Sequence, residues 1–248
     1  MYNDIHLGPV TIHMYGLMIA LGFVSAYLIG DYRAKKKGLS EDIILGILWC
    51  AVIGGFVGAR VLYYVVSIED IMNDISVLWD FGNGYVVYGG ILGGVLAGYV
   101  YIRSKKERFI VYFDLMAPSI ALAQGFGRIG CFFAGCCYGR ATDLPIGIVF
   151  RHSDYAPNGV PLMPTQLISS AGDFLIAFIL FMYGRKKRPD GSIGGLYMIL
   201  YSIGRFAIEY LRNDYRGSMW GLSTSQIISI VVLLGGVALE IVSVSKNK

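Results

Sequence analysis

The chain has 248 residues, of which 55% are hydrophobic and only 15% are charged, and its formal net charge is +4. Soluble domains carry about 25% charged residues, so a soluble monomer of this composition would have too little polar surface. The composition therefore favours an integral membrane protein, and a nucleic-acid partner is not expected.

Seven apolar segments have about the length that a helix needs to cross roughly 30 Å of hydrocarbon. In chain order they lie near residues 12–30, 43–66, 85–102, 109–124, 164–183, 192–211 and 222–244. We expect an all-α polytopic membrane protein with about seven transmembrane helices. Residues 1–248 are predicted to form a single transmembrane domain with an outer loop around 140–163.

The basic residues predict how these helices are oriented. Four basic clusters contain all nine lysines, and they fall on one side of the membrane if every segment crosses once. Because cytoplasmic loops retain Lys and Arg, the N-terminus is expected outside and the C-terminus in the cytoplasm. The clusters occupy residues 33–37, 103–108, 185–188 and 246–248.

The seven other basic residues are all arginine, and all lie within or beside a span on the predicted outer side. They are Arg60, Arg128, Arg140, Arg151, Arg205, Arg212 and Arg216. Arginine presents a planar fork that binds phosphate through two hydrogen bonds. An ionisable group deep in a span indicates a functional site, which applies to Arg60, Arg128 and Arg205. For Arg140, Arg151 and Arg216, snorkelling to the interface is an equal alternative.

Two motifs indicate an anion site near the outer surface. Residues 125–139 hold five glycines, each costing a helix about 1 kcal/mol relative to Ala, so we expect broken backbone that lines a cavity beside Arg128. Arg205, Glu209 and Arg212 have the i, i+4, i+7 spacing of one helical face. Either they bind an anionic head group or they form a self-neutralised ion pair.

The cysteines allow several interpretations. Cys131, Cys136 and Cys137 are clustered, whereas Cys50 lies alone in the second span. Zinc sites usually need two such clusters, so no metal is expected. A disulfide facing an oxidising exterior, a nucleophilic Cys136 activated by Arg128 and small buried apolar groups are the alternatives.

Seven motifs, in order along nearly the whole chain, resemble one known family. They are Tyr15-Gly16-Leu17-Met18, Gly58-Ala59-Arg60, Tyr88-Gly89-Gly90, Gly127-Arg128-Ile129-Gly130 through Gly139, Pro164-Thr165-Gln166-Leu167, the Arg205/Glu209/Arg212 pattern, and Leu222-Ser223 with Gln226. The sequence thus resembles prolipoprotein diacylglyceryl transferases, in a cysteine-rich branch.

The resemblance implies an enzyme of the bacterial cytoplasmic membrane that takes part in the first step of lipoprotein maturation. Such enzymes move the sn-1,2-diacylglyceryl group from phosphatidylglycerol to the lipobox cysteine thiol of a prolipoprotein. A thioether forms, glycerol 1-phosphate leaves, and no cofactor or metal is expected. The catalytic candidates are Arg128, Arg205, Tyr88 and Glu209. The phosphatidylglycerol-binding candidates are Arg128, Arg205, Arg212, Arg60, Tyr15, Gly139 and Gln166.

Three positions depart from the family pattern. Tyr88 stands where a histidine is common, and Cys131 and Cys136 stand where well-studied members carry Asn and Glu. The general base is therefore unassigned, and two alternatives stay open: a paralogue with another acceptor, and a non-catalytic protein that binds or transports anionic lipid. The outer loop, which holds Arg151 and Tyr155, is expected to form a lid or a precursor-binding surface.

Overall fold

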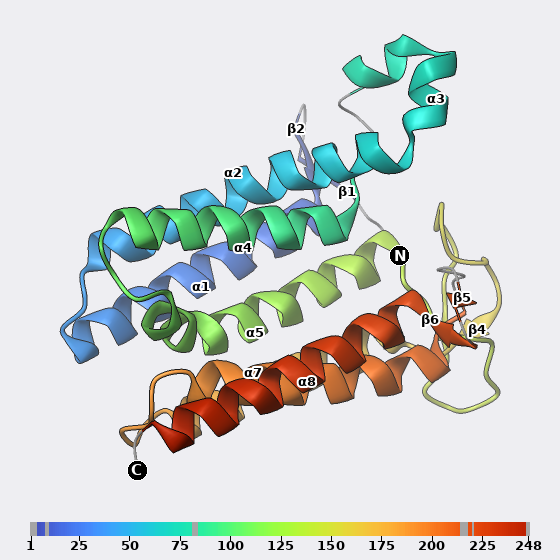
Figure 1. Ribbon diagram of the computed structural model, residues 1–248. Helices are drawn as coiled ribbons and strands as arrows, with labels where there is room; N and C mark the ends of the chain where they lie inside the picture. The colour runs from blue at the N-terminus through green and yellow to red at the C-terminus, as the bar shows by residue number, and fades with distance from the viewer. Residues whose placement is uncertain (1–3, 8–9, 81–83, 214–217, 220, 247–248) are drawn as a thin grey trace. The chain divides into compact units, whose positions relative to one another are not determined.

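The structure is a computed structural model that describes residues 4–7, 10–80, 84–213, 218–219 and 221–246, so Arg216 lies outside the described residues. Helices dominate this part of the chain (Figure 1), which confirms the all-helical class. The long helices are α1 (Met14–Lys37), α2 (Glu41–Val66), α4 (Val87–Ser104), α5 (Phe109–Ala134), α6 (Thr165–Tyr183), α7 (Ser192–Ile208) and α8 (Thr224–Ser245). The shorter helices are α3 (Ile68–Asn73) and the 3-10 turns η1 (Ile75–Trp79) and η2 (Glu209–Leu211).

Within the ranges that the structure describes, three antiparallel two-stranded hairpins join or precede these helices, and the sequence pattern did not predict them. They are β1 (Asp4–Leu7) with β2 (Val10–His13), β3 (Ile148–Val149) with β4 (Pro161–Leu162), and β5 (Ser218–Met219) with β6 (Leu222–Ser223). Strands of two to four residues contribute little pairing energy. The β1–β2 hairpin leads into α1, and the other two hairpins act as connections between helices.

Five of the described helices are long and apolar enough to cross a membrane: α1, α2, α5, α6 and α8. The other two long helices, α4 and α7, have 18 and 17 residues. At a rise of 1.5 Å per residue these span about 26 Å, slightly less than the hydrocarbon thickness of about 30 Å. Exposed apolar side chains on α8, including Val231, Leu234 and Ile241, are typical of a lipid-facing surface.

The chain divides into two compact units, which are described separately. The first unit contains Met1–Gly30 and Phe113–Lys248, and the second contains Asp31–Tyr112. Of the candidate site residues, only Arg60 and Tyr88 belong to the second unit.

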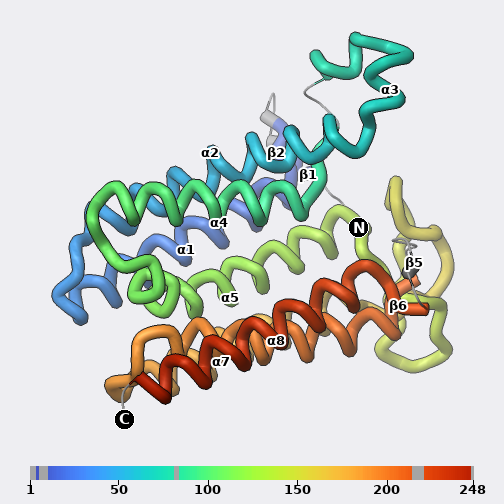
Figure 2. The backbone as a smooth tube through the Cα atoms, viewed as in Figure 1, coloured from blue at the N-terminus to red at the C-terminus, as the bar shows by residue number. Residues whose placement is uncertain are grey.

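Helices α2 and α4 form the second unit by running side by side in opposite directions (Figure 2). Glycines make this close approach possible. A Cβ added to Gly58 would lie 2.3 Å from the carbonyl oxygen of Gly89, and one added to Gly93 would lie 2.2 Å from that of Gly54. Small residues four apart are typical of helices that pack backbone to backbone in lipid.

In the first unit, α6 and α7 pack around a core of small and aliphatic side chains. Ala121 on α5, Ala177 and Leu180 on α6, and Ile193 on α7 are all buried there. Asp114 of α5 joins two elements by accepting hydrogen bonds of 2.7 Å from the backbone N–H groups of Gly191 and Gly194. These N–H groups lie at the start of α7, so the carboxylate caps that helix from a neighbouring one.

The glycine-rich segment is more helical than the sequence predicted. The expectation of broken backbone from Gly125 onwards is wrong, because α5 continues through three of the five glycines to Ala134. Close packing explains the continuous helix: a Cβ on Gly125 would lie 2.4 Å from the Phe174 ring, and one on Gly130 would lie 3.2 Å from the Tyr15 ring. The chain leaves the helix only at Gly135, where φ is +72°.

The predicted outer loop has its own small core. Phe150, 2% exposed, packs with Phe132 of α5, Ala156 and Leu162. Ser153 organises the tip, because its Oγ accepts hydrogen bonds from the backbone of Tyr155 (3.2 Å) and Ala156 (2.9 Å). The loop is therefore a folded part of the first unit.

We predict that Gly58→Ala destabilises the protein by about 1–3 kcal/mol, the usual cost of overpacking. Its new Cβ would meet the backbone of Gly89 and Gly93, which no rotamer change can relieve. Reversible SDS denaturation followed by tryptophan fluorescence would measure the change in unfolding free energy. The matched control is Gly98→Ala on α4, where nothing lies within 4 Å of the new Cβ. Equal stability of the two variants would contradict the close approach of α2 and α4.

Candidate functional site

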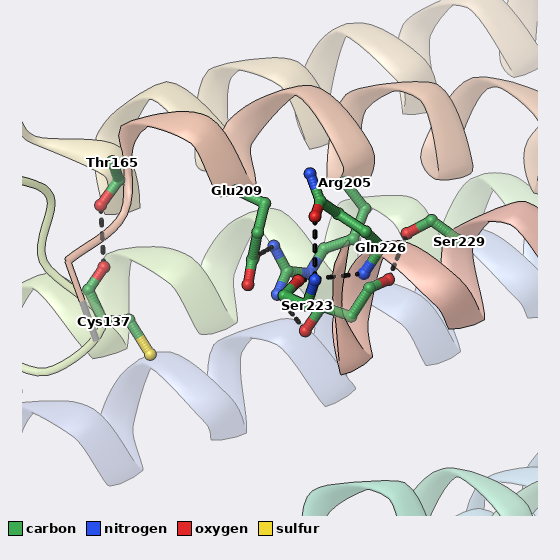
Figure 3. Close-up of polar contacts among 8 residues, drawn as sticks. Cys137, Thr165, Arg205, Glu209, Ser223, Gln226 and Ser229 are labelled. Atoms are coloured by element: carbon green, nitrogen blue, oxygen red, sulfur yellow. Dashed lines mark hydrogen bonds and ion pairs between the residues drawn. The ribbon is translucent and has the colours of Figure 1, made fainter. Parts of the chain in front are cut away.

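At the end of α7, Arg205 and Glu209 form a buried ion pair. Arg205 Nη1 lies 2.6 Å from Glu209 Oε2, and both side chains are 9% exposed. Figure 3 shows Arg205 and Glu209 facing each other. Arg205 Nη2 also donates a 2.7 Å hydrogen bond to Ser225 Oγ at the start of α8. Of the two alternatives for this motif, the structure shows the ion pair between Arg205 and Glu209, and Arg205 joins the adjacent ends of α7 and α8.

The first turn of α8 is held in place beside this pair. Ser223 Oγ accepts from the backbone N–H of Gln226 (3.2 Å), and Gln226 Oε1 accepts from the backbone N–H of Ser223 (3.0 Å). This reciprocal arrangement is a capping box. It fixes where α8 begins, and therefore where Ser225 meets Arg205.

Arg212 does not share a helical face with Arg205 and Glu209, so that prediction is wrong. Helix α7 ends at Ile208, and after the η2 turn Arg212 adopts extended backbone, with φ −81° and ψ 156°. There Arg212 forms an antiparallel bridge with Gly139. The bridge brings its guanidinium close enough to Cys137 for its positive charge to act on that thiol.

Gly139 is enclosed by backbone on two sides. The backbone N–H of Gly139 donates to the carbonyl of Met163 (3.0 Å). The backbone N–H of Arg140 donates to the carbonyl of Leu211 (3.0 Å). A Cβ on Gly139 would lie 2.7 Å from both of these carbonyl oxygens. A glycine is required here to let three backbone segments meet, whatever part it has in binding substrate.

Arg128 on α5 has the environment expected of an anion-binding residue. Within the described ranges, its half-buried guanidinium makes no hydrogen bond and no ion pair. The ionisable groups that act on its charge are Tyr201, Cys131, Asp173 and Cys137. Its hydrogen-bonding capacity is therefore not used by the part of the chain that the structure describes.

The structure also identifies polar residues near Arg128 that sequence reasoning missed. Asp173 on α6 is buried and lies close enough to Arg128 for the two side chains to interact electrostatically. On α7, the rings of Tyr197 and Tyr201 stack with centroids 5.8 Å apart, and Tyr197 Oη donates to Gln124 Oε1 (2.9 Å). Asp173 could have been found, because an ionisable residue inside a predicted span indicates function.

Tyr15 and Gln166 lie in the same unit as Arg128. Tyr15, at the start of α1, packs against Gly130 of α5 and is within electrostatic range of Arg128. Gln166, 1% exposed, donates a 2.8 Å hydrogen bond from Nε2 to the carbonyl of Cys136. Tyr15 thus lies near Arg128, whereas Gln166 supports the turn that follows α5.

In the second unit, Arg60 is used to fold the segment between α2 and α4. Its guanidinium donates to the carbonyls of Gly84 (3.2 Å), Val77 (3.1 Å) and Leu78 (3.2 Å), and Nε donates to Tyr64 Oη (2.7 Å). These contacts attach the α3–η1 segment to α2. Tyr88, in the first turn of α4, is half-buried.

The three cysteines after Arg128 form one cluster with unequal acidities. Hydrogen bonds with the Cys131 and Cys137 side chains, together with burial, raise the pKa of the Cys136 thiol above its ordinary value. Hydrogen bonds from Cys131 and Cys136, supported by the charge of Arg212, lower the pKa of Cys137. The positive charge of Arg212 therefore favours Cys137 as the thiolate of the cluster.

We predict that iodoacetamide labels Cys137 before Cys136 at about pH 7, below the ordinary thiol pKa of about 8.5. A lowered pKa means that the reactive thiolate exists at lower pH, and a raised pKa has the opposite effect. Peptide mass spectrometry of reduced protein in a chelating buffer would measure both rates across pH. Arg212→Gln should shift the Cys137 profile to higher pH, and earlier labelling of Cys136 would contradict the assignment.

Comparison with known proteins identifies the family. The family model described as prolipoprotein diacylglyceryl transferase matches residues 4–242. A phosphatidylglycerol–prolipoprotein diacylglyceryl transferase of Clostridium tetani is 47% identical over 228 residues, covering 92% of each chain. Transferase 2 of Clostridium perfringens is 45% identical, covering 96% of this chain and 94% of its own. A relative from Clostridioides difficile is 36% identical over 96% of this chain. The chain belongs to the prolipoprotein diacylglyceryl transferase family.

Proposed function

We propose that this enzyme transfers the sn-1,2-diacylglyceryl group of phosphatidylglycerol to the lipobox cysteine of a prolipoprotein, the first step of bacterial lipoprotein maturation. The names of the relatives from C. tetani and C. perfringens support both substrates. The thiol loses its proton to solvent or to the released phosphate, and its sulfur forms a bond to the terminal glycerol carbon of the diacylglyceryl group. The carbon–oxygen bond to phosphate breaks, its electron pair stays on oxygen, and glycerol 1-phosphate leaves.

The observation that carries the proposal is the environment of Arg128. A charged group removed from water is costly unless it is paired. Arg128 is half-buried and has no hydrogen bond or ion pair among the residues that the structure describes. Its planar fork fits two oxygens of a phosphate. Phosphate bound here gains negative charge as the carbon–oxygen bond breaks, and a fixed guanidinium stabilises that charge.

The other arginines of the first unit take different parts in this proposal. Arg205 is already paired with Glu209, so Glu209 serves to hold the guanidinium and limit its net charge. Arg212 reaches the cysteine cluster from the Gly139 bridge and adds positive potential there. Tyr15 provides a hydroxyl near Arg128 for a second contact with the head group. In the second unit, Arg60 has a supporting part, because it holds the segment between α2 and α4 in place.

The membrane arrangement is part of the proposal. The chain crosses the bacterial cytoplasmic membrane about seven times as a single domain, with its N-terminus outside and its C-terminus in the cytoplasm. Basic clusters at the cytoplasmic ends support this orientation. The phosphate site then lies in the outer half of the membrane, and both acyl chains can stay in lipid. A cavity of about 250 Å³ is lined by apolar residues of α5 and α6 such as Leu122 and Phe178. It offers additional apolar surface for an acyl chain.

The proposal is tested with purified protein in detergent, phosphatidylglycerol and a lipobox peptide, in a buffer with a metal chelator. Mass spectrometry should show one diacylglyceryl group added to the peptide cysteine, with release of glycerol phosphate. Transfer to another thiol or hydroxyl acceptor would favour a paralogue. Lipid binding with no transfer to any acceptor, while a relative is active in parallel, would favour a non-catalytic lipid-binding protein.

We predict that Arg128→Lys lowers kcat/KM for transfer by about 10²–10³-fold, the usual effect of losing one preorganised donor to a developing anion. Lysine keeps the charge but cannot provide the fork, so the variant separates geometry from charge. The control is Arg103→Lys, an exposed arginine at the end of α4, which should leave transfer unchanged. Full activity of the Arg128 variant in correctly folded protein would contradict the phosphate assignment.

Tyr88→Phe tests whether the phenol takes part in the reaction. We propose that the Tyr88 hydroxyl orients the thiol or the phosphate by hydrogen bonding. Loss of one such bond should lower transfer by about tenfold, equivalent to about 1.4 kcal/mol. Peptide turnover equal to that of the wild type would remove the hydroxyl from the mechanism.

A further inference from the structure

Three cysteine side chains converge immediately after Arg128. The sulfur atoms of Cys131, Cys136 and Cys137 all lie within 4.8 Å of one another, and each residue is half-buried. None of the three is in a disulfide. The fourth cysteine, Cys50, is on α2 in the second unit. The cluster is thus a local feature of the first unit that the proposed transfer reaction does not use.

The backbone around the cluster is fixed by buried groups. Thr165 Oγ1 donates to the carbonyl of Cys137 (Figure 3), and Gln166 Nε2 donates to that of Cys136, both at 2.8 Å. Both donors are 1% exposed. Cys137 has a φ of +61°, a left-handed conformation that costs a non-glycine residue about 1–3 kcal/mol and persists where its surroundings enforce it. The turn is therefore held in the form that brings the sulfurs together.

This donor set suits one class of ligand. Thiolates prefer soft metal ions such as Zn²⁺, Cd²⁺ and Cu⁺, whereas Mg²⁺ and Ca²⁺ require oxygen ligands. Zinc–sulfur bonds of about 2.3 Å in a tetrahedral site place sulfurs about 3.8 Å apart. Sulfurs within 4.8 Å reach that spacing by small side-chain rotations.

The surrounding charge also fits a metal–thiolate complex. Three thiolates with one Zn²⁺ carry a net charge of −1, because binding releases the thiol protons to solvent. Arg128 and Arg212 both act electrostatically on the cluster. Their positive charges compensate the negative charge of the complex.

We propose that Cys131, Cys136 and Cys137 form a three-thiolate site for one soft metal ion, with Zn²⁺ and Cd²⁺ as its probes. The test of this site is a binding measurement, which can be made without the transfer reaction. The fourth coordination position is left to water or a small ligand.

The first experiment is a Cd²⁺ titration of the reduced full-length protein, purified through an affinity tag without histidine or cysteine. Cadmium–thiolate charge-transfer absorption in the ultraviolet should saturate at one ion per chain, and Zn²⁺ should displace it. Cys131→Ser, Cys136→Ser and Cys137→Ser should each weaken binding by at least about 100-fold, since loss of outer contacts alone costs 10–100-fold. Cys50→Ser, the matched control, should bind like the wild type.

A second measurement on the wild type does not depend on whether the variants fold. N-Ethylmaleimide labelling with and without Zn²⁺, read by peptide mass spectrometry, should show slower labelling of the three clustered cysteines and unchanged labelling of Cys50. Equal labelling of the cluster in both conditions would overturn the proposal. So would a disulfide between two of its cysteines in protein purified without reductant, because it would leave too few thiolates.

Discussion

The two hydrogen bonds from the start of α6 to the turn after α5 are the constraint on which the site depends. Thr165 Oγ1 donates to the carbonyl oxygen of Cys137, and Gln166 Nε2 donates to that of Cys136; both hydrogen bonds are 2.8 Å long. Because both donors are buried, water cannot replace them, and losing either would leave a polar group unpaired. The turn in this position brings Gly139 against Met163 and Leu211, and so places Arg212 near the thiols.

The arginines show that one residue type serves different purposes according to its neighbours. Arg60 uses its donors on backbone carbonyls of a loop, where the planar fork can join several acceptors at once. Arg205 is neutralised by Glu209 and joins two helix ends. Arg128 has neither kind of partner in the described chain, so its charge is available to a ligand. The difference lies in local geometry, since all three are arginines in or beside predicted spans.

Glycine also has two separate uses. Between α2 and α4, the facing backbone leaves no room for a Cβ atom, and glycine has none. The two helices can therefore approach closely enough for dispersion contacts between their backbones. In lipid, where the hydrophobic effect does not drive helices together, such contacts stabilise the pair. In α5, Gly125 and Gly130 instead make room for the Phe174 and Tyr15 rings of neighbouring helices. The helix persists there because packing offsets the low helix propensity of glycine.

The sequence alone determined the helical class, the approximate position of every long helix and the family, because apolar runs and ordered motifs are local patterns. It also offered the Arg205–Glu209 ion pair as one of two alternatives, because residues four apart lie near each other where the chain is helical. It could not predict that α5 continues through its glycines, that α7 ends before Arg212, or that Asp173 lies near Arg128. Contacts between distant segments decide these features: Phe174 packs on Gly125, and the Gly139 bridge takes Arg212 into extended backbone. Only tertiary structure specifies which segments meet.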